Sequence, residues 1–315
     1  MSQFSSVIIG NESLAVGCGD ALLARGHQIS AVVSQDDGIR SWAEKHGIPV
    51  HASPDALTEG FDWLLSIANL RVIPDRVLTL AAKGAVNFHD GPLPRYAGLN
   101  APNWALIEGA DSYGITWHMI EGGIDEGDIL AQRLFDVAAD DTAFSLNSKC
   151  YAAAMDSFGT VIDQLEAGTL NRQPQDLSQR SYYARSDRPA AGALIDFIAP
   201  AAAITRLVRA LDFGGYWNPL CSSKCAIGEN ILLVGSAEAV EGAGAPGSVI
   251  EVSKDRLTVA CGDGAVRLSG LTDPAGRKRA PVDLCKPGDA LPVLDAAEKH
   301  AITEALAKTQ KGESH

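Results

Sequence analysis

The feature that most constrains the fold is a regular alternation, through residues 1–168, of short Val- and Ile-rich segments with longer segments of helical spacing. Strands are expected at 6–10, 27–34, 48–50, 61–67, 85–89 and 114–119, and helices at 13–25, 37–45, 74–82 and 144–168. Strands joined by helices form right-handed crossovers, which give a mostly parallel sheet. The first half of the chain is therefore predicted to be a Rossmann-like α/β domain.

The second half follows a different pattern. Residues 169–199 are rich in Asn, Gln and Ser, a composition typical of a linker, and a helix is expected at 201–211. Short strands follow at 231–234, 247–252, 257–261 and 265–271, which predicts a small OB-like β-barrel, and a last helix is expected at 296–308. A length of 315 residues favours two domains, so we expect an N-terminal domain (1–180), a linker (181–200), a barrel domain (201–300) and a tail (301–315).

The charge of the chain is uneven, which bears on its partners. The net charge is -13, and residues 200–315 hold 13 basic and 14 acidic residues, which leaves 13 basic and 25 acidic residues in 1–199. Nucleic acids are bound by dense fields of Lys and Arg, so a nucleic-acid partner is disfavoured. No apolar run reaches the ~20 residues of a membrane span, and the start of the chain lacks a signal-peptide pattern. We expect a cytoplasmic protein with no membrane partner.

Two classes of cofactor are also disfavoured. Cys221 and Cys225 form the only close cysteine pair, and a structural zinc site needs four ligands, so no metal is expected. A dinucleotide loop needs glycines crowded at the turn after the first strand, whereas six residues separate Gly10 from Gly17 and Glu12 stands where an anion would bind. We expect these glycines to serve packing rather than NAD binding.

Polar side chains gather at the end of the fifth expected strand. Asn87 and His89 alternate along that strand and therefore share one face. They lie at a carboxyl end of the sheet, which is where open α/β proteins place ligands. Downstream, a glycine-punctuated loop at 122–128 presents Asp125. Asn, His and Asp together supply a neutral donor, a titratable group and an anion that orients it.

Each of these residues also has a structural interpretation. An isolated Asn-x-His at a strand end often serves the fold, and an Asp between glycines often bonds to nearby backbone. His118 lies late in the sixth expected strand, away from the other motif residues, and is expected to be structural.

The joint pattern resembles a known family. The matching residues are Asn87-x-His89, Leu93-Pro94-x-Tyr96-x-Gly98, Trp104, Gly109, Gly114-Ile115-Thr116 and Asp125-x-Gly127-x-Ile129. They are similar to the signature of the 10-formyltetrahydrofolate-dependent formyltransferases, a family that includes methionyl-tRNA, sugar and glycinamide ribonucleotide enzymes and the formylation domains of nonribosomal peptide synthetases. Residues 204–266 resemble that family's C-terminal β-barrel domain, which the glycinamide ribonucleotide branch lacks.

The resemblance implies a reaction and a set of site residues. An amine attacks the formyl carbon of 10-formyltetrahydrofolate, Asn87 and His89 stabilise the oxyanion, and Asp125 orients the imidazole and assists proton transfer, without a metal. The family implies a folate pocket formed by Leu70, Arg71, Ile73, Gly122, Gly123 and Ile124. The substrate cleft is expected to involve Asp90, Pro92, Leu93, Tyr96 and Trp104.

The acceptor is the least constrained part of this interpretation. The tRNA and lipid-sugar branches have Tyr-Arg-Gly where this chain has Tyr96-Ala97-Gly98, and the loss of that arginine disfavours a phosphate-bearing acceptor. Residues 89–98 look most like the formylation domains of peptide synthetases, so we expect a small or carrier-protein-bound amino-acid amine. A methionyl-tRNA or amino-sugar formyltransferase, a formyltetrahydrofolate hydrolase and a non-catalytic folate-binding scaffold remain alternatives.

Overall fold

The computed structural model describes residues 2–216 and 218–312, which form two compact units. The first unit contains residues 1–101, 112–137 and 147–183, and the second contains 102–111, 138–146 and 184–315. The chain therefore enters the second unit twice before it passes there for good after Tyr183.

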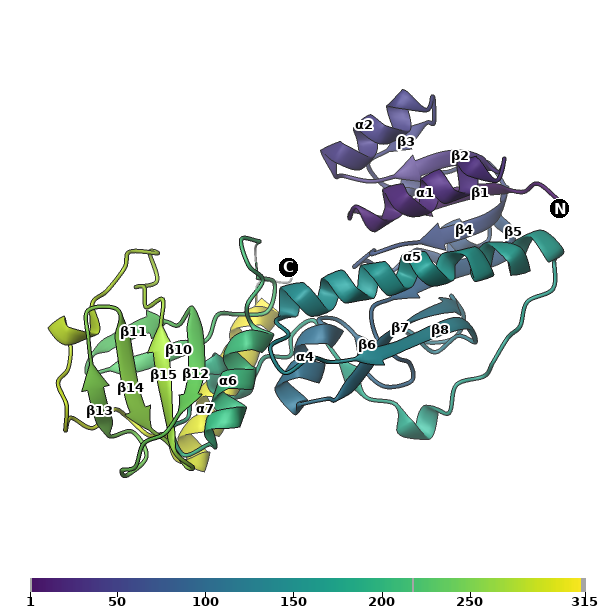
Figure 1. The fold of residues 1–315 in the computed structure, drawn as a ribbon. Coiled ribbons are helices and arrows are strands. Elements are labelled where there is room, and N and C mark those ends of the chain that lie inside the picture. Colours follow the sequence, from purple (N-terminus) through teal and green to yellow (C-terminus); the bar gives the residue numbers. More distant parts are fainter. Residues whose placement is uncertain (1, 217, 313–315) are drawn as a thin grey trace. The chain divides into compact units, whose positions relative to one another are not determined.

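The first unit is built on a seven-stranded sheet (Figure 1). Its strands, in the order β3-β2-β1-β4-β5-β7-β8, are β3 (Val50–His51), β2 (Gln28–Val33), β1 (Ser5–Ile9), β4 (Phe61–Ser66), β5 (Ala81–His89), β7 (Ser112–Met119) and β8 (Ile129–Asp136). The pairs from β3 to β5 are parallel, whereas β7 is antiparallel to both β5 and β8. The expected mostly parallel α/β architecture is confirmed.

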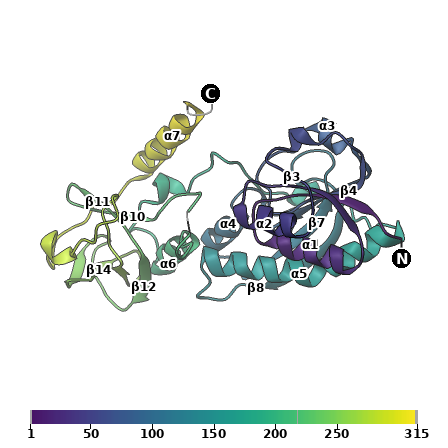
Figure 2. The same cartoon turned by 90° about the horizontal axis from the view of Figure 1, so that it is seen from above.

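Helices cover both faces of this sheet. The first unit contains α1 (Leu14–Ala24), α2 (Asp37–Lys45), α3 (Asp75–Leu78) and all but the first turn of α5 (Ala143–Ala167), and Figures 1 and 2 show the long α5 running beside α1. Met155 of α5 contacts the Cys18 thiol of α1, and Ser157 accepts a hydrogen bond from the Trp117 indole of β7. On the other face, Ile73 and Val77 pack into an apolar cluster with alternate residues of β1 and β2.

The glycines after β1 serve close packing, as the sequence predicts. A Cβ on Gly10 would lie 2.3 Å from the Ile67 carbonyl oxygen, and one on Gly19 would lie 2.2 Å from the Trp42 ring. Only glycine permits such an approach of backbone to backbone or of helix to helix.

The second unit is an antiparallel β domain with flanking helices. It contains a four-stranded sheet in the order β12-β15-β14-β13 and a two-stranded ribbon β10-β11. Its strands are β10 (Lys224–Ile227), β11 (Asn230–Leu233), β12 (Ser236–Val240), β13 (Val249–Val252), β14 (Arg256–Ala260) and β15 (Ala265–Ser269). Their inward residues form one apolar core with α6 (Ala201–Ala210), and the unit also holds most of α4 (Ala101–Glu108) and all of α7 (Ala296–Gly312).

Several segments differ from their sequence-based description. The helix expected at 74–82 is only the four-residue α3, because β5 already begins at Ala81. Helix α7 continues to Gly312, so residues 301–312 of the expected tail are helical, and 313–315 lie outside the described residues. Residues 172–183 are not a free linker, since they carry β9 (Tyr182–Tyr183), which pairs with β6 (Ala97–Gly98).

Within the described residues, no helix combines the length and the apolar character that a bilayer crossing requires.

Candidate active site

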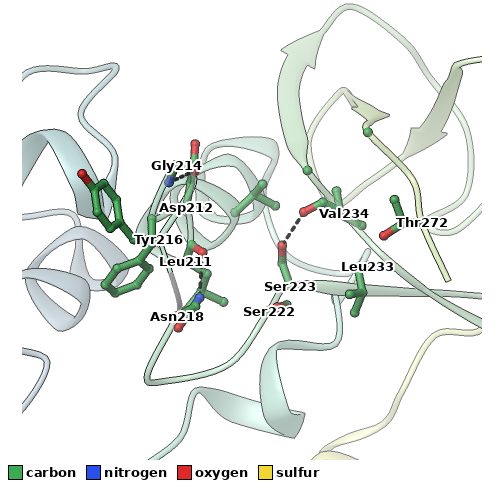
Figure 3. Close-up of a pocket in the computed structure, with 14 residues that line it drawn as sticks. Leu211, Asp212, Gly214, Tyr216, Asn218, Ser222, Ser223, Leu233, Val234 and Thr272 are labelled. Atoms are coloured by element: carbon green, nitrogen blue, oxygen red, sulfur yellow. Dashed lines mark hydrogen bonds between the residues drawn. The ribbon is translucent and has the colours of Figure 1, made fainter. Parts of the chain in front are cut away.

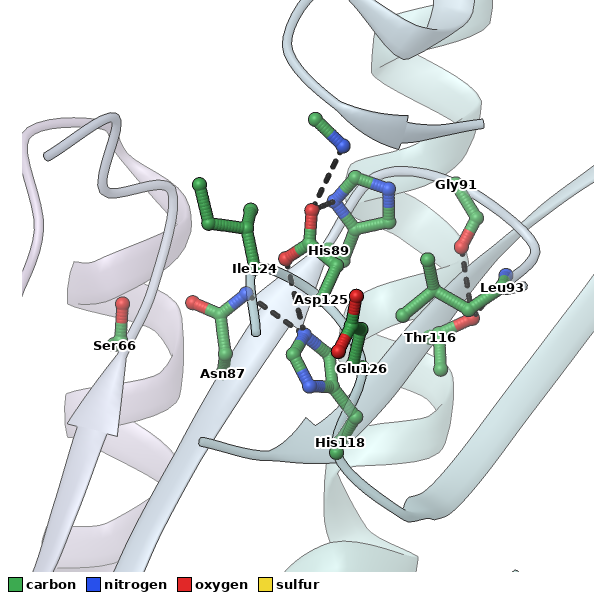
Figure 4. Close-up of polar contacts among 12 residues, drawn as sticks. Ser66, Asn87, His89, Gly91, Leu93, Thr116, His118, Ile124, Asp125 and Glu126 are labelled. Atoms are coloured by element: carbon green, nitrogen blue, oxygen red, sulfur yellow. Dashed lines mark hydrogen bonds and ion pairs between the residues drawn. The ribbon is translucent and has the colours of Figure 1, made fainter. Parts of the chain in front are cut away.

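Two neighbouring strands and one loop bring the polar side chains together (Figure 4). Strand β5 ends at His89, β7 ends at Met119, and the loop at 120–128 folds back so that Asp128 O accepts a hydrogen bond from Met119 N. A Cβ on Gly127 would lie 1.9 Å from the Met119 carbonyl oxygen, so this return requires glycine. The loop thereby places Asp125 beside the end of β5.

The surroundings of His89 fix its proton arrangement. The imidazole is 5% exposed, and its Nε2 lies 2.8 Å from the Tyr96 carbonyl oxygen. A carbonyl oxygen can only accept, so Nε2 carries a proton and donates it there. The other nitrogen, Nδ1, lies 3.7 Å from Asp125 Oδ2 and 3.9 Å from Asp90 Oδ1. Nδ1 is therefore the nitrogen that a reacting group can use.

Asp125 is a carboxylate held in its ionised form. Burial favours the neutral acid, but the adjoining His89 and His118 and the hydrogen bond from Gly98 N outweigh it and hold the pKa of Asp125 well below its usual range. The Gly98 N–H donates to Oδ2 at 2.8 Å. The backbone of Asp125 is left-handed, with φ of 57°, a conformation that few non-glycine residues adopt.

His118 belongs to this cluster, and the expectation that it lies away from the motif residues was wrong. The antiparallel register places His118 directly opposite Asn87, and Figure 4 shows the two side chains joined. His118 Nδ1 donates to the Met119 carbonyl oxygen at 2.8 Å, and its Nε2 lies 3.1 Å from Asn87 Nδ2 and 3.4 Å from Asp125 Oδ1. The pairing of β5 with β7 is the signal that sequence reasoning lacked, since strand order alone does not give register.

A second carboxylate adjoins the cluster. The Asp90 side chain is 34% exposed, and the Tyr113 hydroxyl donates to the Asp90 carbonyl oxygen at 2.6 Å. Desolvation raises the pKa of Asp90, and neighbouring Asp125 adds to this, while His89 opposes it. The two carboxylates on either side of His89 therefore differ, since Asp125 holds its charge more strongly than Asp90.

The loop after His89 is fixed by side chains that sequence reasoning did not single out. Thr116 Oγ1 donates to the Gly91 carbonyl oxygen at 2.7 Å and accepts from Leu93 N at 3.1 Å. Gln132 Nε2 donates to the Leu93 carbonyl oxygen at 2.9 Å. These bonds tie the loop to β7 and β8 and restrict the movement of His89.

The residues expected to bind folate differ in their exposure to solvent. Leu70 is 63% and Ile124 50% exposed, which is unusual for large apolar side chains. Arg71 is exposed, whereas Ile73 is buried in the core of the unit. Gly122 has φ of 68°, and Gly123 N donates to Glu126 Oε2 at 3.1 Å.

Most residues expected in the substrate cleft are less accessible than Asp90. Pro92 is half-buried, and the Leu93 and Tyr96 side chains are 3% and 1% exposed. The Tyr96 ring stacks on Tyr183, so Tyr96 acts on the site through its carbonyl group. Trp104 is buried in the second unit.

The second unit has a pocket of its own, of about 220 Å³ (Figure 3). Its lining includes Asp212, whose carboxylate accepts from Gly214 N at 2.8 Å, and Ser223, whose hydroxyl donates to the Val234 carbonyl oxygen at 3.0 Å. The described lining residues include no histidine and thus no imidazole–carboxylate pair. Over 2–216 and 218–312 there is also no group of three or more His, Cys, Asp or Glu placed to hold a metal ion.

Comparison with known proteins gives consistent matches along the chain. Residues 5–162 match the family described as formyl transferase, and residues 190–286 match its C-terminal domain. The chain is 32% identical over 299 residues to the methionyl-tRNA formyltransferase of Ectopseudomonas mendocina (strain ymp), covering 88% of this chain and 93% of that protein.

Two solved structures share the fold. One is the sugar 3N-formyl transferase WlaRD, determined in the presence of dTDP and 5-N-formyl-THF, with a TM-score of 0.70, 19% identity and coverage of 85% of this chain and 98% of that one. The other is an N-formyltransferase from Helicobacter canadensis in complex with folinic acid and dTDP-3-aminofucose, with a TM-score of 0.70, 20% identity and coverage of 85% and 99%.

Proposed function

The chain belongs to the formyl transferase family, and from this premise we propose that it transfers the formyl group of 10-formyltetrahydrofolate to the primary amine of a small or carrier-bound amino-acid-type acceptor. The observation that carries the proposal is the single nitrogen of His89, Nδ1, that faces Asp125 while Nε2 is occupied by the Tyr96 carbonyl oxygen.

The proposed reaction is direct acyl transfer. The acceptor amine forms a C–N bond to the formyl carbon, and the carbonyl oxygen becomes an oxyanion that accepts hydrogen bonds from the Asn87 amide and the protonated His89 Nδ1. Asp125 keeps its charge and thereby stabilises the imidazolium. The bond from the formyl carbon to N10 then breaks, and the proton released by the amine passes to N10 through a water held by the Asp125 carboxylate, so that tetrahydrofolate leaves.

The folate is proposed to lie against the two loops that precede and follow this cluster. Leu70, Val72 and Ile124 expose large apolar surfaces there, at 63%, 81% and 50%. Apolar side chains of this kind suit the flat pterin and aminobenzoyl rings. The solved relatives that were determined with 5-N-formyl-THF or folinic acid support the same donor class.

The electrostatics of the site support a cationic acceptor. Asp90 and Asp125 both approach His89, and residues 1–199 carry 25 acidic against 13 basic residues. Such a field concentrates ammonium groups and repels phosphates. Asp90, with its raised pKa, is placed to take the proton that an ammonium group must lose before it attacks.

A methionyl-tRNA acceptor is the second candidate, since the relative from Ectopseudomonas mendocina carries that name. Release of tetrahydrofolate separates the candidates when it is measured with free amino acids, carrier-bound aminoacyl thioesters, amino-sugar nucleotides and methionyl-tRNA. We expect release that depends on an amino-acid-type amine and is lost in His89→Ala. Release with methionyl-tRNA alone would favour the second candidate, and equal release without amine would mean a hydrolase.

A further inference from the structure

The segment at 172–183, here called the strap, lies between the two regions that match the family, which end at 162 and resume at 190. Its composition is that of a linker, but its backbone pairs with the first unit at both ends. Gln173 exchanges two backbone hydrogen bonds with Ile129 of β8, at 2.8 and 2.9 Å. At the other end, β9 pairs with β6, the strand that contains Gly98.

Strap side chains donate hydrogen bonds to backbone carbonyl groups of the loop that carries Asp125. Gln175 Nε2 donates to the Asp125 carbonyl oxygen at 2.9 Å and to the Gly127 carbonyl oxygen at 2.7 Å. Arg180 donates to the Ile124 carbonyl oxygen at 2.8 Å. The left-handed backbone of Asp125 is therefore held by bonds from a different part of the chain.

The hydrogen bonds of Gln175 determine which end of its side-chain amide is the nitrogen and which is the oxygen. Both neighbours of Nε2 are carbonyl oxygens, so Nε2 must be the donor, and its two N–H groups are both used. The other end, Oε1, is buried and has no hydrogen-bond partner among the described residues. A glutamate here would place an acceptor against two acceptors, and a leucine would leave both carbonyl groups without a donor.

The strap also holds Tyr96, a second residue with a left-handed backbone that contacts His89. Tyr96 has φ of 60°, and its carbonyl oxygen accepts from His89 Nε2. Tyr96 N donates to Ser181 Oγ at 2.8 Å, and Ala97 N donates to the Ser181 carbonyl oxygen at 2.9 Å. One strap thus fixes the backbone on both sides of the imidazole.

We propose that Gln175 is a positioning residue for formyl transfer. By holding the Asp125 and Gly127 carbonyl groups, it keeps the Asp125 carboxylate on Gly98 N and facing His89 Nδ1. The inference rests on the proposed function, since it concerns the same reacting site, but the placement of Asp125 that it explains is independent of any substrate.

The kinetic test compares Gln175→Leu and Gln175→Glu with Gln179→Leu. Gln179 is a matched control, because it lies on the same strap, is exposed and, among the described residues, hydrogen-bonds to Asp176 of the strap alone. With 10-formyltetrahydrofolate and the acceptor that gives the fastest tetrahydrofolate release, we expect kcat of both Gln175 variants to fall by about 10²-fold, the effect of misplacing a catalytic group by ~1 Å. The KM of both Gln175 variants for the folate should stay within about twofold of wild type. The kcat of Gln179→Leu should do the same, because this change misplaces no catalytic group.

A second measurement needs no substrate. Side-chain ¹⁵N–¹H NMR of histidine, recorded at one fixed pH, reports the surroundings of the His89 and His118 rings. We expect the signals of both rings to move in Gln175→Leu and to keep their wild-type positions in Gln179→Leu, because a displaced Asp125 changes the contacts of both rings.

The outcomes separate the two claims. Loss of melting temperature in Gln175→Leu with wild-type kcat and wild-type histidine signals would overturn the positioning role. If Gln175→Leu does not fold, Gln175→Glu, which keeps the length of the side chain, is measured in its place, and wild-type kcat and histidine signals there would equally overturn the inference. A wild-type protein that releases no tetrahydrofolate, while Gln175→Leu still moves the histidine signals, would contradict the proposed function and leave the role of Gln175 in place.

Discussion

A buried imidazole–carboxylate pair of the first unit that lies outside the candidate site, His27 with Glu166, is built differently from the pair of His89 and Asp125. His27 Nε2 lies 2.9 Å from Glu166 Oε1, its Nδ1 accepts from Phe4 N, and the Phe4 ring stacks on it at 3.8 Å. Both ring nitrogens of His27 are thus occupied by the protein. His89 Nδ1 lies 3.7 Å from Asp125 Oδ2 and 3.9 Å from Asp90 Oδ1, so that both carboxylates are near it at more than hydrogen-bond distance.

The difference is the one that the proposed reaction would require of its scaffold. The His27 and Glu166 side chains contact each other directly, and this contact links the residue before β2 to the end of α5. The Asp125 carboxylate is instead held from outside, by Gly98 N on one side and through its backbone by Gln175 on the other. Holding a group by its neighbours leaves the reactive atoms free, which is the usual design of a preorganised site.

The largest expected effect is a loss of activity when the pair of His89 and Asp125 is changed. Asp125→Asn keeps the shape of the side chain but removes the charge that stabilises the His89 cation. We expect kcat for tetrahydrofolate release to fall by about 10²- to 10⁴-fold, the range for loss of a general acid–base group. Circular dichroism of the variant should match wild type, and an unchanged kcat would remove Asp125 from the reaction.

Breaking the His27–Glu166 pair should lower the stability of the protein and leave its activity unchanged. His27→Ala leaves the buried Glu166 carboxylate with only its longer ion pair to Arg25, at 3.7 Å, and breaking a buried pair destabilises proteins by up to about 3–5 kcal/mol. Urea denaturation should show that loss, while kcat per folded molecule stays at the wild-type value. The double variant His27→Leu with Glu166→Leu should regain part of the stability. A loss of kcat without a loss of stability would place His27 in the reaction instead.

At the contact between β6 and β9, the position of Asp125 can be tested by shifting the backbone instead of replacing the side chain. A Cβ on Gly98 would lie 2.1 Å from the Tyr183 carbonyl oxygen, so Gly98→Ala must shift the backbone that donates to Asp125. We expect kcat to fall by about 10- to 10²-fold, since small displacements of catalytic groups have effects of this size. Gly60→Ala is the control, because its Cβ would be 3.7 Å from the nearest atom, and both variants should be assayed side by side.

The smallest expected effect is on the pH dependence of stability. Because the pKa of Asp125 is lowered in the folded state, its interactions contribute stability above the unfolded value of about 3.9, and that contribution is lost as pH falls through the lowered folded value. The free energy of unfolding should therefore fall more steeply below about pH 4 in wild type than in Asp125→Asn. Parallel curves from urea denaturation would contradict the lowered pKa.

The sequence predicted the alternating elements of the first unit because Val- and Ile-rich runs and helical spacing are local signals. It did not predict β8, an edge strand in which only Leu130 is buried and the apolar residues show no simple alternation. His118 was assigned to the fold because its partner Asn87 is 31 residues away and becomes visible only through the β5–β7 register. The strap was interpreted as a linker because polar composition does not distinguish a solvated Gln from one that donates to two buried carbonyl groups.

The most direct test of the account is a single turnover with the protein in excess over 10-formyltetrahydrofolate, in the presence of the acceptor chosen by the release assay. Mass spectrometry of the quenched reaction counts formylated acceptor, formate and tetrahydrofolate. We predict one formylated acceptor for each tetrahydrofolate in wild type and in His27→Ala, and unreacted donor in His89→Ala. Formate in place of formylated acceptor, or a wild-type rate in His89→Ala, would contradict the assignment of this site to formyl transfer.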